Sequence, residues 1–431
     1  MNLRDVERAM LAQGVTQLLY KKLSPNDNSK NQVYIAGSLG ILNVLPMGEI
    51  QSVRTSKGMH ILSAALDFHW LRLDGEPAVA PNTQLILYPQ YPEVRLSGFL
   101  LGARGAPNQL MTSRDEGRVL FLGITRSQRI LAYADNDPAL VAELSALGGL
   151  AQTGAFKHLP IGTADTSRDR LLERLTTIAA AGWVQAQRLY PDGHLGPCGG
   201  TNCGGYTLEA QLGIAPNGRS EPDFEGWELK SHAVTRFDRL GVGQLTLMTP
   251  EPTGGFYKTQ GAAAFVRRFG YADRTVGDRL NFSSPHRAGV RNEVTGLTLQ
   301  LLGYDTREER ITDPHASFAL HDDEGEIAAE WHYAGLLKHW NRKHAKAAYV
   351  PSLCQRGDPV HYRYGDRVRL GIETDFERFL AAVSSGAVWY DPGIKLELAS
   401  SGEPRLKRRS QFRIRSASLA KLYARFEEIA L

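Results

Sequence analysis

Residues 222–230 read Pro-Asp-Phe-Glu-Gly-Trp-Glu-Leu-Lys and hold carboxylates and a lysine at close spacing. Side chains two positions apart on a β-strand point to the same face, so Glu228 and Lys230 are expected to share one site while Leu229 packs behind them. Asp223 can then share a divalent cation with Glu228. Hard cations such as Mg²⁺ bind carboxylate oxygens and keep positions open for water and a substrate phosphate. This stretch therefore indicates metal-dependent hydrolysis of a phosphodiester bond.

The residues before this stretch make the pattern more specific. Charged residues near the end of a strand are common, and on their own they indicate only a solvated edge. Here residues 204–221 lead into the stretch and read Gly-Gly-Tyr-Thr-Leu-Glu-Ala-Gln-Leu-Gly-Ile-Ala-Pro-Asn-Gly-Arg-Ser-Glu. Together the two segments resemble the MvaI/BcnI restriction endonucleases, a branch of the PD-(D/E)XK nucleases. That family pairs a GxTLE…LGI…N segment with a PD…G.ELK segment, and this chain has both in the same order.

This resemblance implies a site, a cofactor and a fold. It makes Asp223 and Glu228 the metal ligands and Lys230 the catalytic lysine, which orients or helps to deprotonate the attacking water. Glu209 becomes a further acid, supplied by a helix beside the site. The implied cofactor is Mg²⁺, held as one ion or two, and the implied substrate is double-stranded DNA. The implied fold is an α/β domain with a mixed sheet flanked by helices.

Two further groups of polar residues are candidates for DNA contact. His232 continues the face of Glu228 and Lys230, and it either contacts the scissile phosphate or closes the strand with a hydrogen bond. Residues 408–415 alternate basic and apolar side chains, as in a strand. Arginine and glutamine are suited to reading base edges in the major groove. Such a strand would place four of these side chains on one side: Arg409, Gln411, Arg413 and Arg415.

The length of 431 residues indicates more than one domain. Short β-rich segments separated by turn residues fill the first 150 residues. In one of them, residues 61–71, Leu66, Phe68 and Trp70 alternate with polar neighbours, as in a single half-buried strand. We expect a β-rich, barrel-like domain over residues 1–155 and the catalytic α/β domain over residues 165–431.

A motif near the N-terminus suggests what the first domain does. Residues 21–27 read Lys-Lys-Leu-Ser-Pro-Asn-Asp, with Gln32 five positions later. This is similar to the K-x-LS-x-ND…Q opening of the EcoRII-type effector domain, a β-pseudobarrel that binds DNA. The alternative is an ordinary polar loop, because these residue types cluster in turns. The resemblance implies DNA contacts by five side chains: Lys21, Lys22, Ser24, Asn26 and Gln32.

The composition is that of a soluble globular protein, with 42% hydrophobic and 22% charged residues. No apolar run is long enough to cross a membrane and no signal peptide is recognisable, so a cytoplasmic protein is expected. The cysteines, Cys198, Cys203 and Cys354, do not form a disulfide framework. A zinc site would need further ligands that the sequence does not offer at the usual spacing. Reduced thiols are expected.

These observations favour a Mg²⁺-dependent, sequence-specific DNA endonuclease of the type II restriction class. Its first domain would bind DNA as an effector or targeting module. We expect it to act as a monomer, and a restriction-modification system implies a cognate DNA methyltransferase as genetic partner. One alternative is a nicking or mismatch-repair nuclease of the same fold. Another is a catalytically silent DNA-binding protein, against which the complete set of acidic residues and Lys230 argues.

Overall fold

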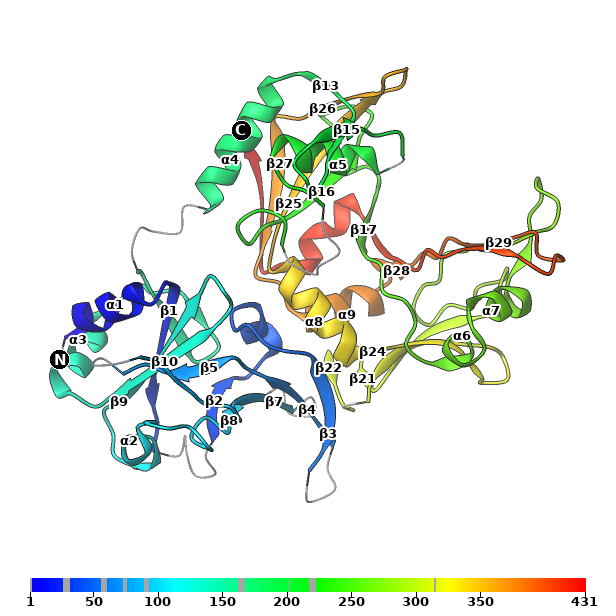
Figure 1. Cartoon of the computed structure of the whole chain (residues 1–431). Helices are drawn as coiled ribbons and strands as arrows, with labels where there is room; N and C mark the ends of the chain where they lie inside the picture. The colour runs from blue at the N-terminus through cyan, green and yellow to red at the C-terminus, as the bar shows by residue number, and fades with distance from the viewer. Residues whose placement is uncertain are drawn as a thin grey trace. The chain divides into compact units, whose positions relative to one another are not determined.

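The computed structural model describes residues 2–25, 32–55, 60–72, 76–88, 93–161, 167–200, 202–216, 222–313 and 315–431, without the side chains of Lys338 and Arg342. The chain forms two compact units. The first comprises Met1–Thr166 with Arg310–Pro314, and the second comprises Ser167–Glu309 with His315–Leu431. Figure 1 shows the elements of both units along the chain.

The first unit is built from two sheets. The seven-stranded sheet has the order β11 (Gln152–Thr153), β12 (Phe156–Leu159), β1 (Val15–Leu23), β9 (Arg118–Thr125), β10 (Ile130–Asp135), β5 (Phe68–Trp70), β6 (Ala78–Val79). The five-stranded sheet has the order β2 (Gln32–Ala36), β8 (Glu93–Ser97), β7 (Gln84–Tyr88), β4 (His60–Ala65), β3 (Ile50–Arg54). The helices are α1 (Leu3–Ala12), η1 (Leu39–Asn43), α2 (Asn108–Thr112) and α3 (Pro138–Ala146), and the separate segment contains β22 (Arg310–Ile311). The region is a β-rich half-barrel, so its predicted β-rich character is confirmed.

Helices α1 and α3 cover one face of the seven-stranded sheet. The side chain of Asn2 caps α1 by accepting a hydrogen bond from the backbone N–H of Asp5, and the carboxylate of Asp5 accepts one from the backbone N–H of Asn2. The strand β9 contributes Gly123, where a β-carbon would lie 2.7 Å from the sulfur of Met10. Glycine therefore lets α1 approach the sheet closely. The shared core contains Val6, Met10, Leu18, Tyr20, Phe121, Leu131, Leu140 and Leu144.

The predicted single strand over residues 61–71 is wrong. The chain leaves the five-stranded sheet at the end of β4, passes through Leu66 and Asp67, and enters the seven-stranded sheet as β5. The backbone of Leu66 donates to Thr83, whereas the carbonyl of Asp67 accepts from Ile130 in the other sheet. This apolar run therefore contributes one strand to each sheet, because the backbone hydrogen-bond partners change between Leu66 and Asp67.

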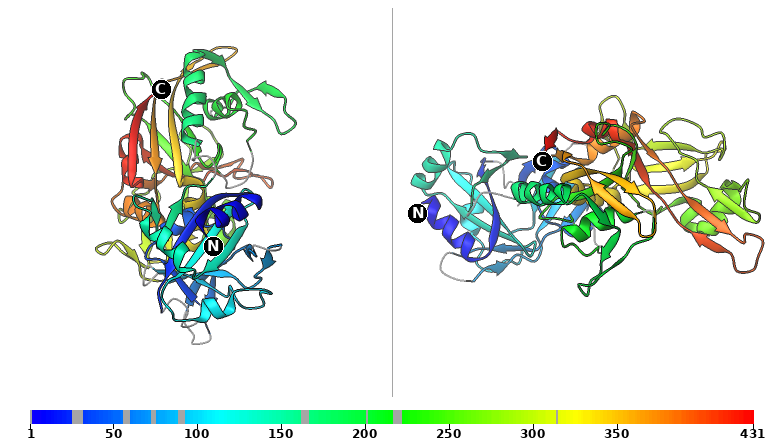
Figure 2. Two further views of the ribbon diagram at one scale, coloured as in Figure 1. Left: turned by 90° about the vertical axis from the view of Figure 1, so that its left-hand side faces the viewer. Right: turned by 90° about the horizontal axis from the view of Figure 1, so that it is seen from above.

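The second unit contains the sheet that carries the candidate site. Its order is β13 (Trp183–Gln185), β26 (His361–Tyr364), β25 (Lys346–Gln355), β27 (Arg367–Ile372), β32 (Arg425–Ala430), and β16 (Glu228–Ala233) also pairs with β25. The pairing of β16 with β25 is parallel and the others are antiparallel. Helices α4 (Ser167–Ala180) and α5 (Cys203–Gln211) pack against this sheet, and both views in Figure 2 place α4 (green) beside its yellow and orange strands. The core between them contains Leu171, Leu175, Ile178, Leu208, Leu212, Leu229, Ala348, Val350, Tyr362 and Val368.

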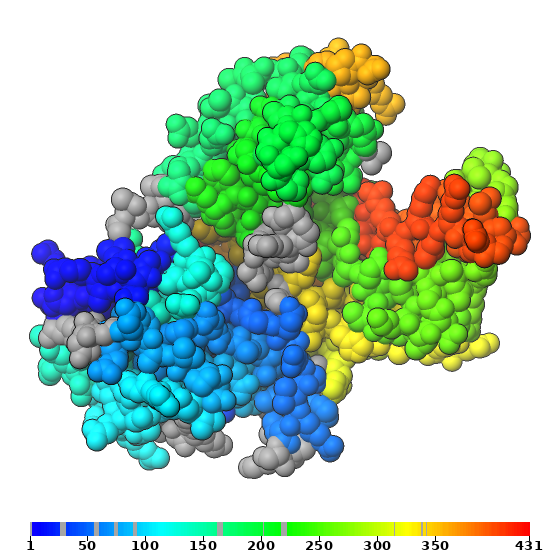
Figure 3. All heavy atoms as spheres, in the orientation of Figure 1, coloured from blue at the N-terminus to red at the C-terminus, as the bar shows by residue number. Residues whose placement is uncertain are grey.

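The remaining elements of this unit form smaller sheets and helices. The sheets are β14–β15 (Gln187–Leu189, Leu195–Pro197), β17–β31–β28 (Gln244–Met248, Phe412–Arg415, Val388–Tyr390), β20–β23–β24 (Thr298–Leu302, Ser317–His321, Ile327–His332) and β18–β19–β29–β30 (Tyr271–Ala272, Arg279–Phe282, Ile394–Glu397, Arg405–Lys407), with β21 (Tyr304–Asp305) beside them. The helices are α6 (Gly255–Gln260), α7 (Ala262–Phe269), α8 (Tyr333–His344), α9 (Phe376–Ser384) and η2 (Ser416–Leu422). Figure 3 shows the β29–β30 ribbon (orange-red) packed on the segment that contains β19.

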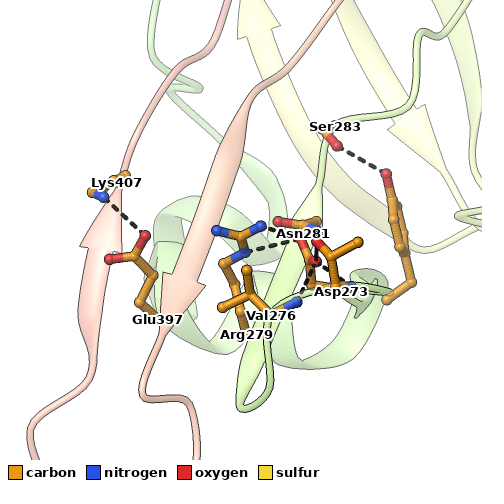
Figure 4. A network of polar contacts seen from close by, with 9 residues as sticks. Asp273, Val276, Arg279, Asn281, Ser283, Glu397 and Lys407 are labelled. Atoms are coloured by element: carbon orange, nitrogen blue, oxygen red, sulfur yellow. Dashed lines mark hydrogen bonds and ion pairs between the residues drawn. The ribbon is translucent and has the colours of Figure 1, made fainter.

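A network of polar contacts fixes this last sheet (Figure 4). Asp273 follows β18 and accepts hydrogen bonds from the backbones of Thr275 and Val276 and from the side chains of Arg279 and Asn281. These hydrogen bonds, above all that of Asn281, hold the pKa of Asp273 well below its usual range. The carboxylate therefore stays ionised and ties the turn after β18 to β19.

Cys198 and Cys203 form a disulfide, which corrects the expectation of reduced thiols. The turn after Cys198 and the start of α5 bring the two α-carbons to 5.7 Å, a separation that a disulfide spans. Cys354 is a free, exposed thiol. In the described part of the chain, no helix has the length and apolar character needed to cross a membrane.

Candidate active site

A tight turn places the first carboxylate beside the strand. Phe224 and Trp227 exchange two backbone hydrogen bonds of 2.9 and 2.8 Å, and the residues between them, Glu225 and Gly226, both have positive φ. This is the geometry of a two-residue hairpin turn, and glycine adopts it without strain. The turn folds Asp223 back over β16, where its Oδ2 accepts a 2.9 Å hydrogen bond from the backbone of Leu229. The residues between Asp223 and Glu228 therefore form the turn that brings the Asp223 carboxylate to the strand.

Strand β16 presents Glu228 and Lys230 on one face. The Nζ of Lys230 lies 2.6 Å from Oε1 of Glu228, whose side chain is 2% exposed. Leu229 lies in the hydrophobic core behind them, as the alternation of strand side chains predicts. Because β16 pairs along its whole length with the buried strand β25, the two functional side chains project from a rigid element.

Glu209 joins this site from helix α5. Burial is the largest cause that raises the pKa of Glu209 to about 7, and repulsion by the carboxylates of Asp223 and Glu228 adds to it. Burial and then the repulsion by Glu228 also raise the pKa of Asp223 to about 6, although the Leu229 amide and two lysines oppose the shift. The three carboxylates therefore form one electrostatically coupled group.

The site also contains a lysine that the sequence pattern does not indicate. The Nζ of Lys343, on helix α8, lies 3.5 Å from the same Oε1 of Glu228. The side chain of Lys343 is only 24% exposed. The same helix carries His339 and His344, and burial, with the repulsion of the two lysines, lowers the pKa of both histidines. No local spacing could have identified Lys343, because it is 113 positions from Lys230 in the sequence.

The donor set suits a hard divalent cation. Oε2 of Glu228 and Oε2 of Glu209 are buried, and neither has a hydrogen-bond partner within the described part of the chain. Buried carboxylate oxygens without a donor are costly unless a cation or a proton satisfies them. Over the residues that the structure describes, no three His, Cys, Asp or Glu side chains enclose a metal position. Mg²⁺ needs no such enclosure, because one or two carboxylates with waters and substrate phosphate oxygens complete its octahedral coordination. The buried oxygens of Glu228 and Glu209 are therefore chemically suited to a hard divalent cation.

His232 lies at the far end of the same strand. It is 6% exposed, and one ring nitrogen lies 3.3 Å from the guanidinium of Arg369, which is itself buried. Burial, and then the charge of Arg369, lowers the pKa of His232 to about 4. A buried neutral ring between the strand and an arginine favours a structural hydrogen bond over a direct DNA contact.

The predicted basic strand is shorter than expected and only partly exposed. Strand β31 begins at Phe412, so two of the four candidate residues precede it. Gln411 is buried, and its carbonyl oxygen accepts a 3.1 Å hydrogen bond from Thr246. Arg413 forms an ion pair of 2.8 Å with Asp391. Arg409 and Arg415 are exposed, and these two remain available at the surface.

In the first unit, the predicted DNA-contacting residues gather around one cavity. Its volume is about 730 Å³. Four predicted residues line it, namely Lys21, Lys22, Ser24 and Gln32, whereas Asn26 lies outside the described residues. Three more polar side chains that the motif did not include also line it: Arg95, Gln152 and Lys157. The cavity is therefore strongly basic.

The strands hold several of these side chains in place. The ammonium of Lys21 lies over the ring of Tyr34, 5.8 Å from its centre. Arg95 donates a 3.2 Å hydrogen bond to the side chain of Gln32, and Lys22 donates one of 2.6 Å to Ser145. The motif of residues 21–32 thus spans β1 and β2, and both strands contribute to the same wall.

Comparisons with known proteins identify the family of this chain. The family model of the MvaI/BcnI restriction endonuclease family matches residues 172–423. The structure of MvaI in complex with its cognate DNA substrate aligns at 17% identity over 62% of this chain and 99% of that chain, with a TM-score of 0.45. MvaI in the absence of DNA aligns at 16% identity over 63% of this chain and 100% of that chain, with a TM-score of 0.34. A comparison with curated proteins gives no match. The family match spans more than half of the chain, and the protein therefore belongs to the MvaI/BcnI restriction endonuclease family of site-specific deoxyribonucleases.

Proposed function

We propose that this type II restriction enzyme cleaves double-stranded DNA at a specific sequence in a Mg²⁺-dependent reaction. The observation that carries the proposal is the arrangement of Asp223, Glu228 and Lys230 around the hairpin and strand β16. Two acidic groups and an ammonium meet within one buried site, which is the donor set that phosphodiester hydrolysis needs.

Each side chain has a separate task in this mechanism. Asp223 and Glu228 would hold Mg²⁺, which, when bound, lowers the pKa of a water ligand and offsets the charge of the phosphate. The hydrogen bond from the Leu229 amide fixes the orientation of the Asp223 carboxylate. Lys230 is anchored by Glu228, so its remaining N–H groups are held ready to orient the attacking water and to stabilise the developing charge. Glu209 supplies a third carboxylate that can accept the proton from this water.

Lys343 adds a second ammonium to the catalytic group. It reaches Glu228 from α8, on a different element from Lys230. Its ammonium lies beside the carboxylates, where it would bind an oxygen of the substrate phosphate. We therefore assign Lys343 to stabilisation of the transition-state charge.

Domain roles follow from the positions of the basic residues. We assign residues 165–431 to catalysis, on a mixed sheet flanked by helices, with the exposed Arg409 and Arg415 as contacts to DNA. Residues 1–155 would bind DNA as an effector or targeting domain through the basic cavity lined by Lys21, Lys22 and Lys157. Clustered lysines and arginines bind the phosphate backbone through counterion release.

The biological setting follows from the proposed substrate. A restriction enzyme that cuts cellular DNA needs protection by a cognate DNA methyltransferase, and it acts in the cytoplasm where that DNA lies. We propose that the chain works as a monomer.

The test is digestion of sequenced plasmid DNA with Mg²⁺, followed by mapping of the cut ends. Discrete double-strand ends at one short sequence support the proposal. Discrete nicks in one strand would indicate the nicking alternative, and absence of cleavage across several divalent cations would favour the silent DNA-binding alternative.

A further inference from the structure

The hairpin β14–β15 carries a stack of aromatic rings around one arginine. The rings of Tyr190 and His194 are nearly parallel, with centres 4.4 Å apart and an angle of 4° between their planes. The guanidinium carbon of Arg188 lies 5.4 Å from the ring centre of Tyr190 and 4.7 Å from that of Tyr206, on helix α5. Arg188 is therefore held between two tyrosine rings, a position that favours a cation.

Arg188 has its charge uncompensated within the part of the chain that the structure describes. Its Nε is buried and has no hydrogen-bond partner, and no carboxylate pairs with the guanidinium. Unlike Arg188, the other basic residue of the stack has a carboxylate partner, because His194 pairs with Asp192 at 2.5 Å. A guanidinium that is held rigidly without a counter-ion is suited to bind an external anion, and its planar donors match the geometry of a phosphate.

The backbone of the hairpin is shaped to support the stack. Arg188 pairs with Gly196 across the hairpin, and a β-carbon at Gly196 would lie 2.8 Å from the ring of Tyr190. Glycine at this position therefore lets the Tyr190 ring lie flat over the opposite strand. The turn of the hairpin uses Gly193 with a φ of 88°, a conformation that side chains with a β-carbon rarely adopt.

The hairpin is fastened to the helix that carries Glu209. The buried hydroxyl of Thr207 on α5 accepts from the backbone N–H of Gln187 at 3.0 Å and donates to its carbonyl at 3.2 Å. The disulfide Cys198–Cys203 joins the exit of the hairpin to the first residue of α5. In Figure 1, α5 lies beside β15 and β16. These hydrogen bonds and the disulfide fasten the hairpin, and with it Arg188, to the helix that carries Glu209.

The distance along α5 relates Arg188 to the proposed cleavage site. Tyr206 precedes Glu209 by three residues, and residues at this spacing lie about 5–6 Å apart on the same side of a helix. Arg188 stacks on Tyr206, so the guanidinium lies against the side of α5 that carries Glu209. A DNA strand whose scissile phosphate occupies the carboxylate site would bring a neighbouring phosphate to the arginine.

We propose that Arg188, clamped between Tyr190 and Tyr206, binds a backbone phosphate of the DNA strand next to the scissile phosphate. The proposal rests on the proposed function, because it takes DNA as the ligand. Phosphate contacts fix the register of the duplex without reading its sequence. The hairpin and α5 therefore position the strand for the catalytic residues.

The test measures binding of a fluorescent random-sequence DNA duplex to the full-length protein over a series of salt concentrations without divalent cations. Each phosphate contact contributes about 0.9 to the slope of log affinity against log salt concentration. Arg188→Gln is expected to lower this slope by about one and to weaken binding about ten-fold at low salt. The matched control is Arg168→Gln on α4, which removes an arginine that pairs with Glu427 at 3.2 Å, and it is expected to leave the slope unchanged.

The outcomes separate the inference from the proposed function. An unchanged salt slope in Arg188→Gln overturns the inference, even if the variant is less stable. An equal decrease of the slope in the Arg168→Gln control overturns it as well. If Arg188→Gln does not fold, Arg188→Met serves as the second variant, because its unbranched side chain can fill the space between the rings. Unfolding of both variants would assign Arg188 to the stability of the fold and overturn its assignment to phosphate binding. Failure of the wild-type protein to bind DNA would instead overturn the proposed function.

Discussion

The ammonium of Lys343 on helix α8 lies 3.5 Å from Oε1 of Glu228 on strand β16. The ammonium of Lys230 lies 2.6 Å from the same oxygen. One carboxylate oxygen therefore organises two cations that come from different elements. Its second oxygen, Oε2, has no hydrogen-bond partner among the residues that the structure describes. Glu228 thus connects the strand and the helix, and in the proposed mechanism it would also hold the divalent cation.

Replacement of Lys343 tests its assignment to the reaction. Lys343→Met removes the ammonium but keeps an unbranched side chain, and it is expected to slow cleavage about a hundred-fold, the usual cost of losing one charge-stabilising donor. Single-turnover cleavage of a mapped site measures this rate. The control is Lys346→Met, because Lys346 lies over the ring of Trp227 rather than at Glu228. Equal rates for Lys343→Met and wild type would remove Lys343 from the mechanism.

The basic cavity of the first unit gives a second prediction. The double variant Lys22→Gln and Lys157→Gln removes two cations from the cavity wall. It is expected to weaken DNA binding and to lower the salt slope by about two, since each lost phosphate contact contributes about 0.9. The control is Arg8→Gln, an exposed residue on α1. Filter binding or anisotropy measures the effect, and an unaltered slope in the double variant would show that the cavity does not bind DNA.

Buried histidines predict a loss of stability in acid. His286 is fully buried, its Nε2 lies 2.8 Å from the Thr295 hydroxyl, and burial lowers its pKa from 6.5 to about 4. The unfolded chain therefore binds a proton more tightly than the folded chain. The stabilising contribution is present above pH 6.5 and is lost as the pH falls toward 4, by roughly 2 kcal/mol between pH 7 and 5.

The measurement is urea unfolding of the wild type and of His286→Gln at several pH values. The variant is expected to be less stable at pH 7 but to lose less stability between pH 7 and 5. His232 has a pKa lowered to about 4 and contributes with the same sign, so some pH dependence remains in the variant. Parallel pH profiles for the two proteins would contradict the assignment to His286.

The local sequence was sufficient to predict how Asp223, Glu228 and Lys230 are arranged. The strand alternation places Glu228 beside Lys230, and the glycine-containing turn returns Asp223 to the strand, so both relationships are set within nine residues. Lys343 could not be found in this way. Its position depends on how α8 packs against β16, and a lysine on an amphipathic helix is ordinarily solvated.

Dependence on tertiary packing also explains the other differences between the sequence-based expectations and the structure. The disulfide between Cys198 and Cys203 depends on the direction in which the chain enters α5, which composition does not reveal. The apolar run of residues 61–71 has the alternation of one strand, but its hydrogen-bond partners lie in two sheets. The cavity residues Arg95 and Lys157 join the predicted motif only because β8 and β12 lie near it in the fold.

The central claim is that Asp223, Glu228 and Lys230 form the catalytic group of a Mg²⁺-dependent endonuclease. The most direct measurement is cleavage of supercoiled plasmid DNA by the wild type, by Asp223→Ala and by Lys230→Ala, with Asp238→Ala as a control because Asp238 pairs with Arg236 at the surface. Circular dichroism establishes that each variant is folded. We predict Mg²⁺-dependent cleavage at one sequence by the wild type and the control, and no cleavage by the two site variants. Full activity in folded Asp223→Ala or Lys230→Ala would contradict this account.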